Sequence, residues 1–270
     1  MEKAGIDQGA ARTARELRIQ LAQMTMASQS LERTATDEKS RGHLAVLNQS
    51  ICRMLRVVGR LELSLRLGGE GAQAELVLTD LARVVNGLGG RMGQLLAYAG
   101  VELTVKAPEL LLAMADEELI GQMVMELVAN AAKAVKDKAG GHVRLTLVQQ
   151  GNRAVFTVED NGPGVAPDRL AYLFCSGEEA VPDWRRGGVG VAIARQAAAL
   201  HGGMLVADCA EGRGLRAVAS IPLGEAGENL LRGPGAAWDR GGFDNELIAL
   251  SGLLPAKAFQ PGERSGKRGP

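Results

Sequence analysis

Apolar residues recur in alternating steps of three and four along residues 10–67, a stretch that contains no proline. The clearest run is Leu44, Leu47, Ile51, Met54, Val58, Leu61 and Leu65, and a weaker run is Leu17, Leu21, Met24 and Leu31. This heptad spacing is typical of helices that pack in a bundle or coiled coil. The polar residues 34–39 separate the two runs, and Thr36 or Asp37 can cap the second helix. The pattern predicts an antiparallel helical hairpin over residues 1–68.

A hairpin of two helices buries little apolar surface by itself. We therefore expect a second copy of the chain to supply another hairpin, so that a homodimer forms a four-helix bundle. The alternative is a single hairpin that lies on the next domain of its own chain.

Residues 74–224 combine helical and strand patterns. Helices are expected over residues 76–92, 116–138 and 189–201, and strands over residues 101–105, 110–114, 142–149, 153–159, 204–209 and 216–221. A Gly151-Asn152 turn predicts a hairpin between two of the strands. The fold class is therefore α+β, with an α/β sandwich in which helices face one mostly antiparallel sheet. The Gly-rich tail, residues 225–270, has only a short apolar segment between Phe243 and Leu254.

Composition narrows the functions that the chain can have. Lys+Arg and Asp+Glu both number 31, so the basic excess of a nucleic-acid-binding protein is missing. Aromatic residues make up only 3%, which argues against base-stacking surfaces. The chain contains no apolar run long enough for a membrane span or a signal peptide. Three widely spaced cysteines, Cys52, Cys175 and Cys209, favour reduced thiols and a cytoplasmic location.

The first candidate for chemistry is a polar stripe on the helix expected over residues 116–138. Glu126, Asn130 and Lys133 are spaced i, i+4 and i+7, which puts them on one helical face. The Asn130 carboxamide can be an oxygen ligand of Mg²⁺, Lys133 can meet phosphate charge, and Glu126 can orient or deprotonate a water or hydroxyl. The alternative is a solvated helix face without a ligand.

Two glycine-rich segments are the next candidates. In residues 159–164, Asp160 ends a strand and can accept a hydrogen bond from an exocyclic amine such as that of adenine, while Gly162 and Gly164 allow close backbone approach. Gly188 and Gly190 open a helix, whose backbone N–H groups can bind phosphate. Each segment alone could also be an ordinary turn.

The order of these segments, with Phe174 between the last two, resembles the N, G1, F and G2 boxes of the histidine-kinase/gyrase/chaperone ATPase superfamily. By this resemblance the chain binds ATP with Mg²⁺. Asn130 would hold the metal, Asp160 the adenine amine, and Gly162 and Gly164 the pocket wall, with residues 175–187 as a lid. A heptad hairpin before the ATPase domain is similar to that of sensor histidine kinases of two-component signalling.

The resemblance fails at the phosphoacceptor. Where such kinases have a histidine before Glu-Leu-Arg, this chain has Arg15, and a guanidinium cannot serve as the nucleophile. His43 is the remaining candidate within the hairpin. The chain is therefore expected to be either an ATP-dependent phosphotransferase with a response regulator or other signalling partner, or a pseudokinase that regulates a partner by nucleotide-dependent binding. A third, weaker reading is a slow ATPase module of an assembly machine.

Overall fold

The computed structural model describes residues 2–69, 71–165, 188–209, 214–224 and 243–260. The chain forms two compact units, one of Met1–Arg66 with Ala237–Pro270 and one of Leu67–Ala236. Two expectations, Phe174 and the lid over residues 175–187, lie outside the described residues.

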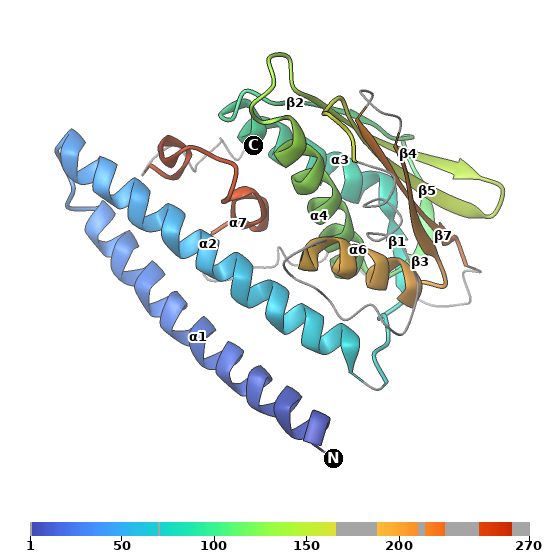
Figure 1. Ribbon diagram of the computed structural model, residues 1–270, viewed down its shortest axis with the longest axis horizontal. Coiled ribbons are helices and arrows are strands. Elements are labelled where there is room, and N and C mark those ends of the chain that lie inside the picture. Colours follow the sequence, from blue (N-terminus) through green and yellow to red (C-terminus); the bar gives the residue numbers. More distant parts are fainter. Residues whose placement is uncertain (1, 70, 166–187, 210–213, 225–242, 261–270) are drawn as a thin grey trace. The chain divides into compact units, whose positions relative to one another are not determined.

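The first unit contains the predicted antiparallel hairpin (Figure 1). Its helices are α1, Glu2–Glu32, and α2, Glu38–Gly68. The start of α2 is capped by Asp37, whose Oδ1 accepts a hydrogen bond from the Ser40 N–H at 2.8 Å. Hydrogen bonds from the Ser40 side chain and backbone hold the pKa of Asp37 below its ordinary value. Across the hairpin Arg18 pairs with Glu62, in an arrangement that fixes one end of the two helices.

The heptad residues of the hairpin fall into two stripes with different surroundings. Leu44, Ile51 and Val58 of α2 are buried, as are Ala14, Leu21 and Ser28 of α1. Leu47, Met54 and Leu61 of α2 are 37–41% exposed, and Leu17, Met24 and Leu31 of α1 are 41–54% exposed. Both sets repeat every seven residues. The sequence predicted a single seam, but the structure divides it into two stripes. The buried stripe holds the hairpin together, and the exposed stripe, called the open stripe below, faces away from that contact.

The apolar segment of the tail belongs to this first unit. It forms α7, Asn245–Leu250, and the 3₁₀ helix η1, Ala256–Phe259. Its apolar residues are buried: Leu247, Ile248, Leu250, Leu254, Ala258 and Phe259.

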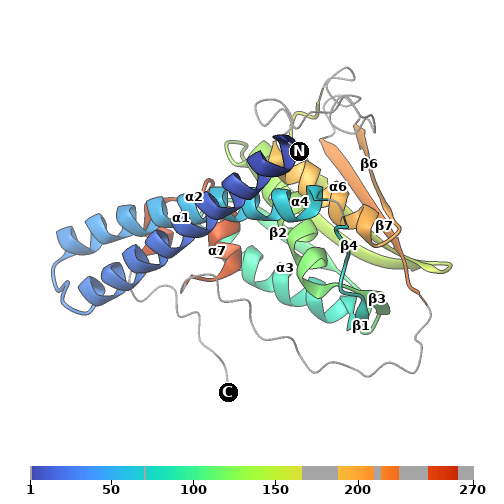
Figure 2. The same ribbon diagram turned by 90° about the horizontal axis from the view of Figure 1, so that it is seen from below.

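The second unit is built on a five-stranded sheet with helices on one face (Figures 1 and 2). The strand order is β2-β4-β5-β7-β6, with only β2 and β4 parallel. The strands are β2 Glu102–Lys106, β4 His142–Gln150, β5 Arg153–Asp160, β6 Met204–Cys209 and β7 Leu215–Pro222, and the helices are α3 Leu81–Ala97, α4 Glu117–Val135 and α6 Val189–Leu200. This is the predicted α/β sandwich.

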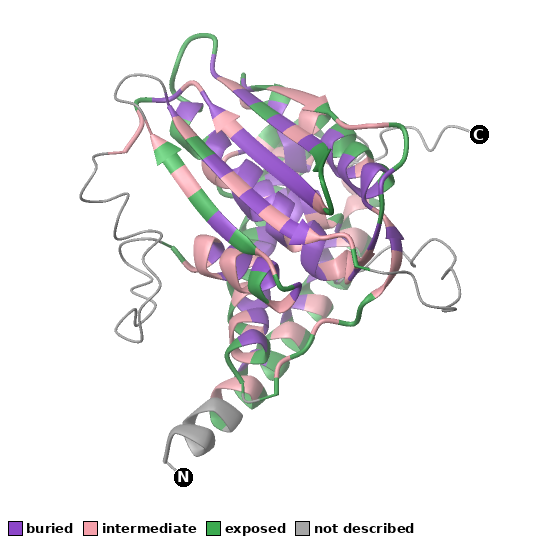
Figure 3. Ribbon diagram, turned by 90° about the vertical axis from the view of Figure 1, so that its right-hand side faces the viewer, coloured by how far each residue is buried: buried purple, intermediate pink, exposed green. Residues whose placement is uncertain are grey.

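Buried and exposed side chains alternate along the strands, so the two faces of the sheet differ in burial. On β4, Val143, Leu145 and Leu147 are at most 1% exposed, whereas Val148 is 38% exposed. Figure 3 looks onto the face that the helices leave open, where the central strand is still largely buried by its neighbours. The β4–β5 hairpin turns through Gly151, whose φ of 58° explains the glycine, as the Gly-Asn pair predicted.

One predicted boundary is wrong. The helix expected over residues 76–92 is preceded by a strand, β1 Val77–Asp80, which pairs antiparallel with β3 Leu112–Ala115. The Asp80 side chain accepts hydrogen bonds from Ala82 N and Arg83 N, so the helix begins only at Leu81. The short apolar run before the cap has no period that distinguishes strand from helix.

Candidate nucleotide-binding site

The candidate site is built from the end of β5, the loop that follows it, and the second half of α4. Asp160 is the last residue of β5 and only 7% exposed. Its Oδ1 accepts a hydrogen bond from the Gly162 N–H at 2.8 Å. Burial raises the pKa of Asp160, while hydrogen bonds from the Gly162 and Leu215 backbones and the charge of Lys138 oppose that rise. The carboxylate is thus held in a fixed orientation in a poorly solvated position.

Gly162 packs directly between Asp160 and the end of α4. A Cβ at this position would lie 2.7 Å from Asp160 Oδ1 and 3.2 Å from the backbone oxygen of Ala134. Gly164 has a φ of 78°, a conformation that side chains other than glycine rarely adopt. Gly162 therefore lets the loop after β5 run close to α4, and the place of Gly162 and Gly164 in a nucleotide pocket stays a prediction.

Asn161 attaches this loop to the segment between α4 and β4. Its Oδ1 accepts from the His142 N–H at 2.9 Å, and its Nδ2 donates to the Gly140 oxygen at 2.9 Å. Lys138 Nζ donates to the Asn161 backbone oxygen. The loop is consequently fixed on both sides of the Asp160 carboxylate.

The polar stripe on α4 runs from the interior to the surface. Glu126 is 5% exposed, Asn130 is half-buried and Lys133 is exposed. The Nδ2 atom of Asn130 is buried and has no hydrogen-bond partner among the described residues. This N–H group can donate to an acceptor that the described residues do not supply, such as a phosphate oxygen, and the binding role of Asn130 stays a prediction.

A side chain of this kind fits an oxygen-coordinated cation. The Asn130 carboxamide offers one neutral oxygen, and Mg²⁺ is commonly held by few protein ligands together with phosphates and water. Within the described ranges no three His, Cys, Asp or Glu side chains gather as a metal site. A cation here would accordingly take most of its ligands from a bound nucleotide and water.

The start of α6 is the remaining element of the site. Gly188 has a φ of 75° and stands at the N-cap, and no side chain in the described part of the chain caps the helix there. The Val191 N–H donates to the Gly188 oxygen at 3.3 Å, so the N–H groups of Val189 and Gly190 are the candidates for binding an anion, and that role stays a prediction. α6 packs beside α4, on the same side of the sheet.

Sequence reasoning missed two residues that shape the site. Gly214, with a φ of 82°, lies so close to Asp160 that a Cβ there would be 1.8 Å from the Asp160 backbone oxygen. Cys209, a free thiol, accepts a hydrogen bond from Val165 N at 3.0 Å and donates one to Gly214 O at 3.2 Å. For Gly214, the glycine before β7 was a signal that the sequence offered. For Cys209, the sequence offered no signal.

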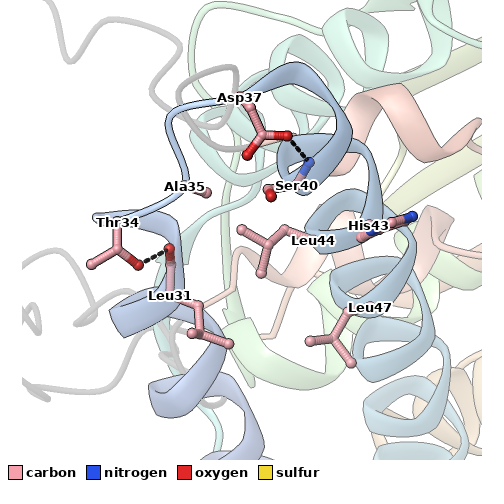
Figure 4. A pocket seen from close by; sticks show the side chains of 8 residues that line it. All are labelled: Leu31, Thr34, Ala35, Asp37, Ser40, His43, Leu44 and Leu47. Atoms are coloured by element: carbon pink, nitrogen blue, oxygen red, sulfur yellow. Dashed lines mark hydrogen bonds between the residues drawn. The ribbon is translucent and has the colours of Figure 1, made fainter.

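A hollow lies at the tip of the hairpin (Figure 4). This cavity of about 510 Å³ is lined by Leu31, Thr34, Ala35, Asp37, Ser40, His43, Leu44 and Leu47. It is mainly apolar, and the exposed heptad residues Leu31 and Leu47 form two of its walls. His43 is exposed at its edge, far along α2 from the end that faces Arg15 of α1.

Comparisons with known proteins agree with this geometry. Residues 115–225 match the family described as histidine kinase-, DNA gyrase B-, and HSP90-like ATPase. The chain is 27% identical to the sensor protein ChvG of Rhizobium meliloti over 238 residues, 82% of this chain and 41% of ChvG. It is 34% identical to the circadian input-output histidine kinase CikA of Synechocystis sp. over 112 residues, 40% of this chain and 15% of CikA.

A solved structure extends the likeness in fold to nearly the whole chain. The crystal structure of full-length ShkA in complex with AMPPNP matches with a TM-score of 0.64 at 23% identity, over 97% of this chain and 61% of that one. At this identity the match establishes the fold alone.

The sheet, the glycine loops and the family match together define a histidine-kinase-type ATPase domain. With a helical hairpin before that domain, the chain as a whole is similar to sensor histidine kinases such as ChvG. It spans about two fifths of the length of ChvG, 41%. None of the described helices is both long and apolar enough to cross a membrane.

Proposed function

We propose that this chain binds Mg²⁺-ATP beside α4 and β5 and transfers the terminal phosphoryl group in two-component signalling. The observation that carries the proposal is the pair of an oriented, buried Asp160 carboxylate and an unpaired Asn130 amide in a domain of this family. Asp160 would accept the hydrogen bond of the adenine amine, and Gly162 and Gly164 would line the pocket. ATP, when bound, supplies the phosphoryl group.

The other residues would act on the phosphate end. Asn130 would hold Mg²⁺ through its carboxamide oxygen, and Lys133 and the N–H groups after Gly188 would bind phosphate oxygens. Glu126 would orient the nucleophile or accept its proton. Phe174, which comes just before the lid of residues 175–187 in the resemblance, would be a further nucleotide-binding residue.

The phosphoacceptor decides between the two forms of this function. Arg15 is exposed on α1 and cannot accept a phosphoryl group, because a guanidinium stays protonated. Transfer would then go to His43, to another side chain or to a histidine of a partner. The second candidate function is a pseudokinase that binds ATP and regulates a partner by its conformation, and the exposed Arg15 favours it.

The hairpin supports a homodimer as the working form. The open stripe joins Leu17, Met24 and Leu31 of α1 with Leu47, Met54 and Leu61 of α2. Six large apolar side chains in heptad register are the surface with which two hairpins form a four-helix bundle. The apolar cavity between Leu31 and Leu47 continues the same stripe to the hairpin tip.

A single labelling experiment separates the candidate functions. The purified chain is incubated with Mg²⁺ and ATP labelled on its terminal phosphate, with Asp160→Ala as the binding-deficient variant and His43→Ala as the acceptor variant. Acid-labile label on the wild type but not on Asp160→Ala identifies a histidine kinase, and its loss in His43→Ala assigns the acceptor.

Other outcomes have defined meanings. No label, together with protection of the wild type against heat by ATP, identifies the ATP-binding regulator. Equal ATP binding by the wild type and Asp160→Ala in calorimetry would refute the proposed adenine pocket.

A further inference from the structure

The tail of the chain is anchored to the outer side of α2 by a regular set of hydrogen bonds. Arg53 Nε donates to the Ser251 oxygen at 3.2 Å, and Gln49 Nε2 donates to the Leu254 oxygen at 2.7 Å. Asn48 Nδ2 donates to the Phe259 oxygen at 3.3 Å. In each bond an α2 side chain is the donor and a backbone carbonyl of the tail is the acceptor. The tail therefore runs antiparallel to α2.

Two of the three acceptors are carbonyls at the ends of short helices, and the third, that of Leu254, lies between the two helices. Ser251 is the C-cap of α7, Leu254 ends the turn after it, and Phe259 is the last residue of η1. The last carbonyls of any helix lack intrahelical donors. Side chains of α2 thus cap both short helices of the tail, which is a recognition of helix ends rather than a general apolar contact.

Asn48 connects this docking to the pairing of α1 and α2. Its side chain is fully buried, its Oδ1 accepts from Ser28 Oγ at 2.6 Å, and its Nδ2 also donates to Glu32 Oε1 at 2.8 Å. The Asn48 amide therefore bonds to two residues of α1, Ser28 and Glu32, and also to the tail. A buried polar group that bridges several segments fixes their register, because any shift would leave it unpaired.

The tail elements are too short to be stable apart from α2. α7 has six residues and η1 has four, and isolated helices of this length do not persist in water. Their apolar side chains, including Leu250 and Phe259 at 0% exposure, are buried in the docked form. Docking and folding of residues 243–260 are consequently one event with two states, as a switch element needs.

We propose that residues 243–260 are an in-cis strap of the hairpin, which locks the α1–α2 register when docked and loosens it when released. Leu47 of the open stripe is next to Asn48, so release of the strap shifts the surface on which two hairpins meet. This consequence for the dimer rests on the proposed function, whereas the docking of the strap does not.

The test uses the full chain with the strap released by Phe259→Ser. Lys257→Ala, an exposed change in the same segment, is the matched control. Hydrogen exchange followed by mass spectrometry should show at least tenfold faster exchange over residues 243–260 in Phe259→Ser, and faster exchange over residues 44–56 of α2. The dimer dissociation constant, measured by sedimentation, should rise at least threefold. Arg53→Ala, which removes a donor on α2, should reproduce both effects more weakly.

A synthetic peptide of residues 243–260 completes the test. Added to Phe259→Ser, the wild-type peptide should restore protection of α2 and the dimer constant, and a peptide with the same Ser change should not. Exchange in Phe259→Ser that equals Lys257→Ala would overturn the strap, and so would an unchanged dimer constant after release. A chain that fails to bind ATP or to dimerise even as wild type would instead refute the proposed function, while the exchange result would still decide whether the strap docks.

Discussion

At the scale of single residues, the Asp160 carboxylate is a compromise between stability and binding. Its buried position raises its pKa in the folded chain, so the fold prefers the neutral acid. A pKa raised above the unfolded value contributes stability at pH below the unfolded pKa, and that contribution is lost as pH rises through the folded pKa. At neutral pH the ionised group therefore costs stability, which the adenine amine would compensate.

Asp160→Asn separates these two effects. The uncharged amide keeps an oxygen that can accept from the Gly162 N–H, so we expect the ligand-free variant to be at least as stable as wild type at pH 7. Any gain should shrink as the pH falls toward 4, because Asp160 of the wild type then becomes protonated. ATP affinity should fall more than tenfold. Thermal unfolding at several pH values measures the stability, and calorimetry measures the ATP affinity. The exposed Asp137→Asn is the control. A destabilised Asp160→Asn at pH 7 would contradict this account.

Asn130 leads to a different prediction, because its Nδ2 makes no hydrogen bond within the described residues. Asn130→Ala should change the free energy of unfolding by less than about 1 kcal/mol, since no intramolecular bond is lost. Its ATP affinity, measured with Mg²⁺ and again with EDTA, should no longer depend on the metal. Asn152→Ala, in the exposed β4–β5 turn, should retain the wild-type dependence. An undiminished effect of Mg²⁺ in Asn130→Ala would place the cation elsewhere.

At the scale of elements, Asp116 is a junction between secondary structures. It caps α4 by accepting from the Leu119 N–H at 3.1 Å, and its other carboxylate oxygen accepts from the Glu75 N–H at 3.1 Å. Its own N–H donates to Nε2 of His201, whose Nδ1 lies 2.7 Å from the Ala197 oxygen. The helix that carries Asn130 is therefore positioned from both the segment before β1 and the end of α6.

Asp116→Ala should lower the free energy of unfolding by about 1–2 kcal/mol, the usual effect of removing an N-cap. Asp116→Asn, which retains an acceptor oxygen, should recover most of the loss. Urea unfolding of the two variants provides the measurement, with Asp208→Ala as an exposed control. If Ala and Asn at position 116 destabilised the chain equally, the cap would not be the cause.

Elements with a strong period were predictable, and contacts distant in sequence were not. The heptad run gave both hairpin helices, and the turn and glycine signals gave the β4–β5 hairpin and the loop after Asp160. β1 was missed because four residues before a cap carry no period of their own. The bond from Asn48 to Phe259 joins residues 211 positions apart, and the tail shows only an apolar segment without the donors that hold it. The unpaired state of Asn130 likewise depends on neighbours that only the fold supplies.

At the scale of the whole molecule, the open stripe of the hairpin should determine the oligomeric state. Met24 lies at the middle of the α1 stripe and is 41% exposed in the single chain. In a two-fold bundle Met24→Lys buries two charges in an apolar contact, which is unfavourable unless they find partners. Because each 1.4 kcal/mol changes affinity tenfold, two such costs should weaken the dimer by about 100-fold or more.

Sedimentation equilibrium of the full chain measures this effect, and Gln23→Lys provides a matched control. Gln23 is exposed one residue away, about 100° around the helix, so its charge would stay in water. The variants should bind ATP equally, since the nucleotide site is made by the second unit alone. Equal dimerisation of Met24→Lys and Gln23→Lys would show that the open stripe is not the contact between copies. Loss of dimers in Met24→Lys alone would mean that the same heptad pattern that folds the hairpin also pairs it with a second copy.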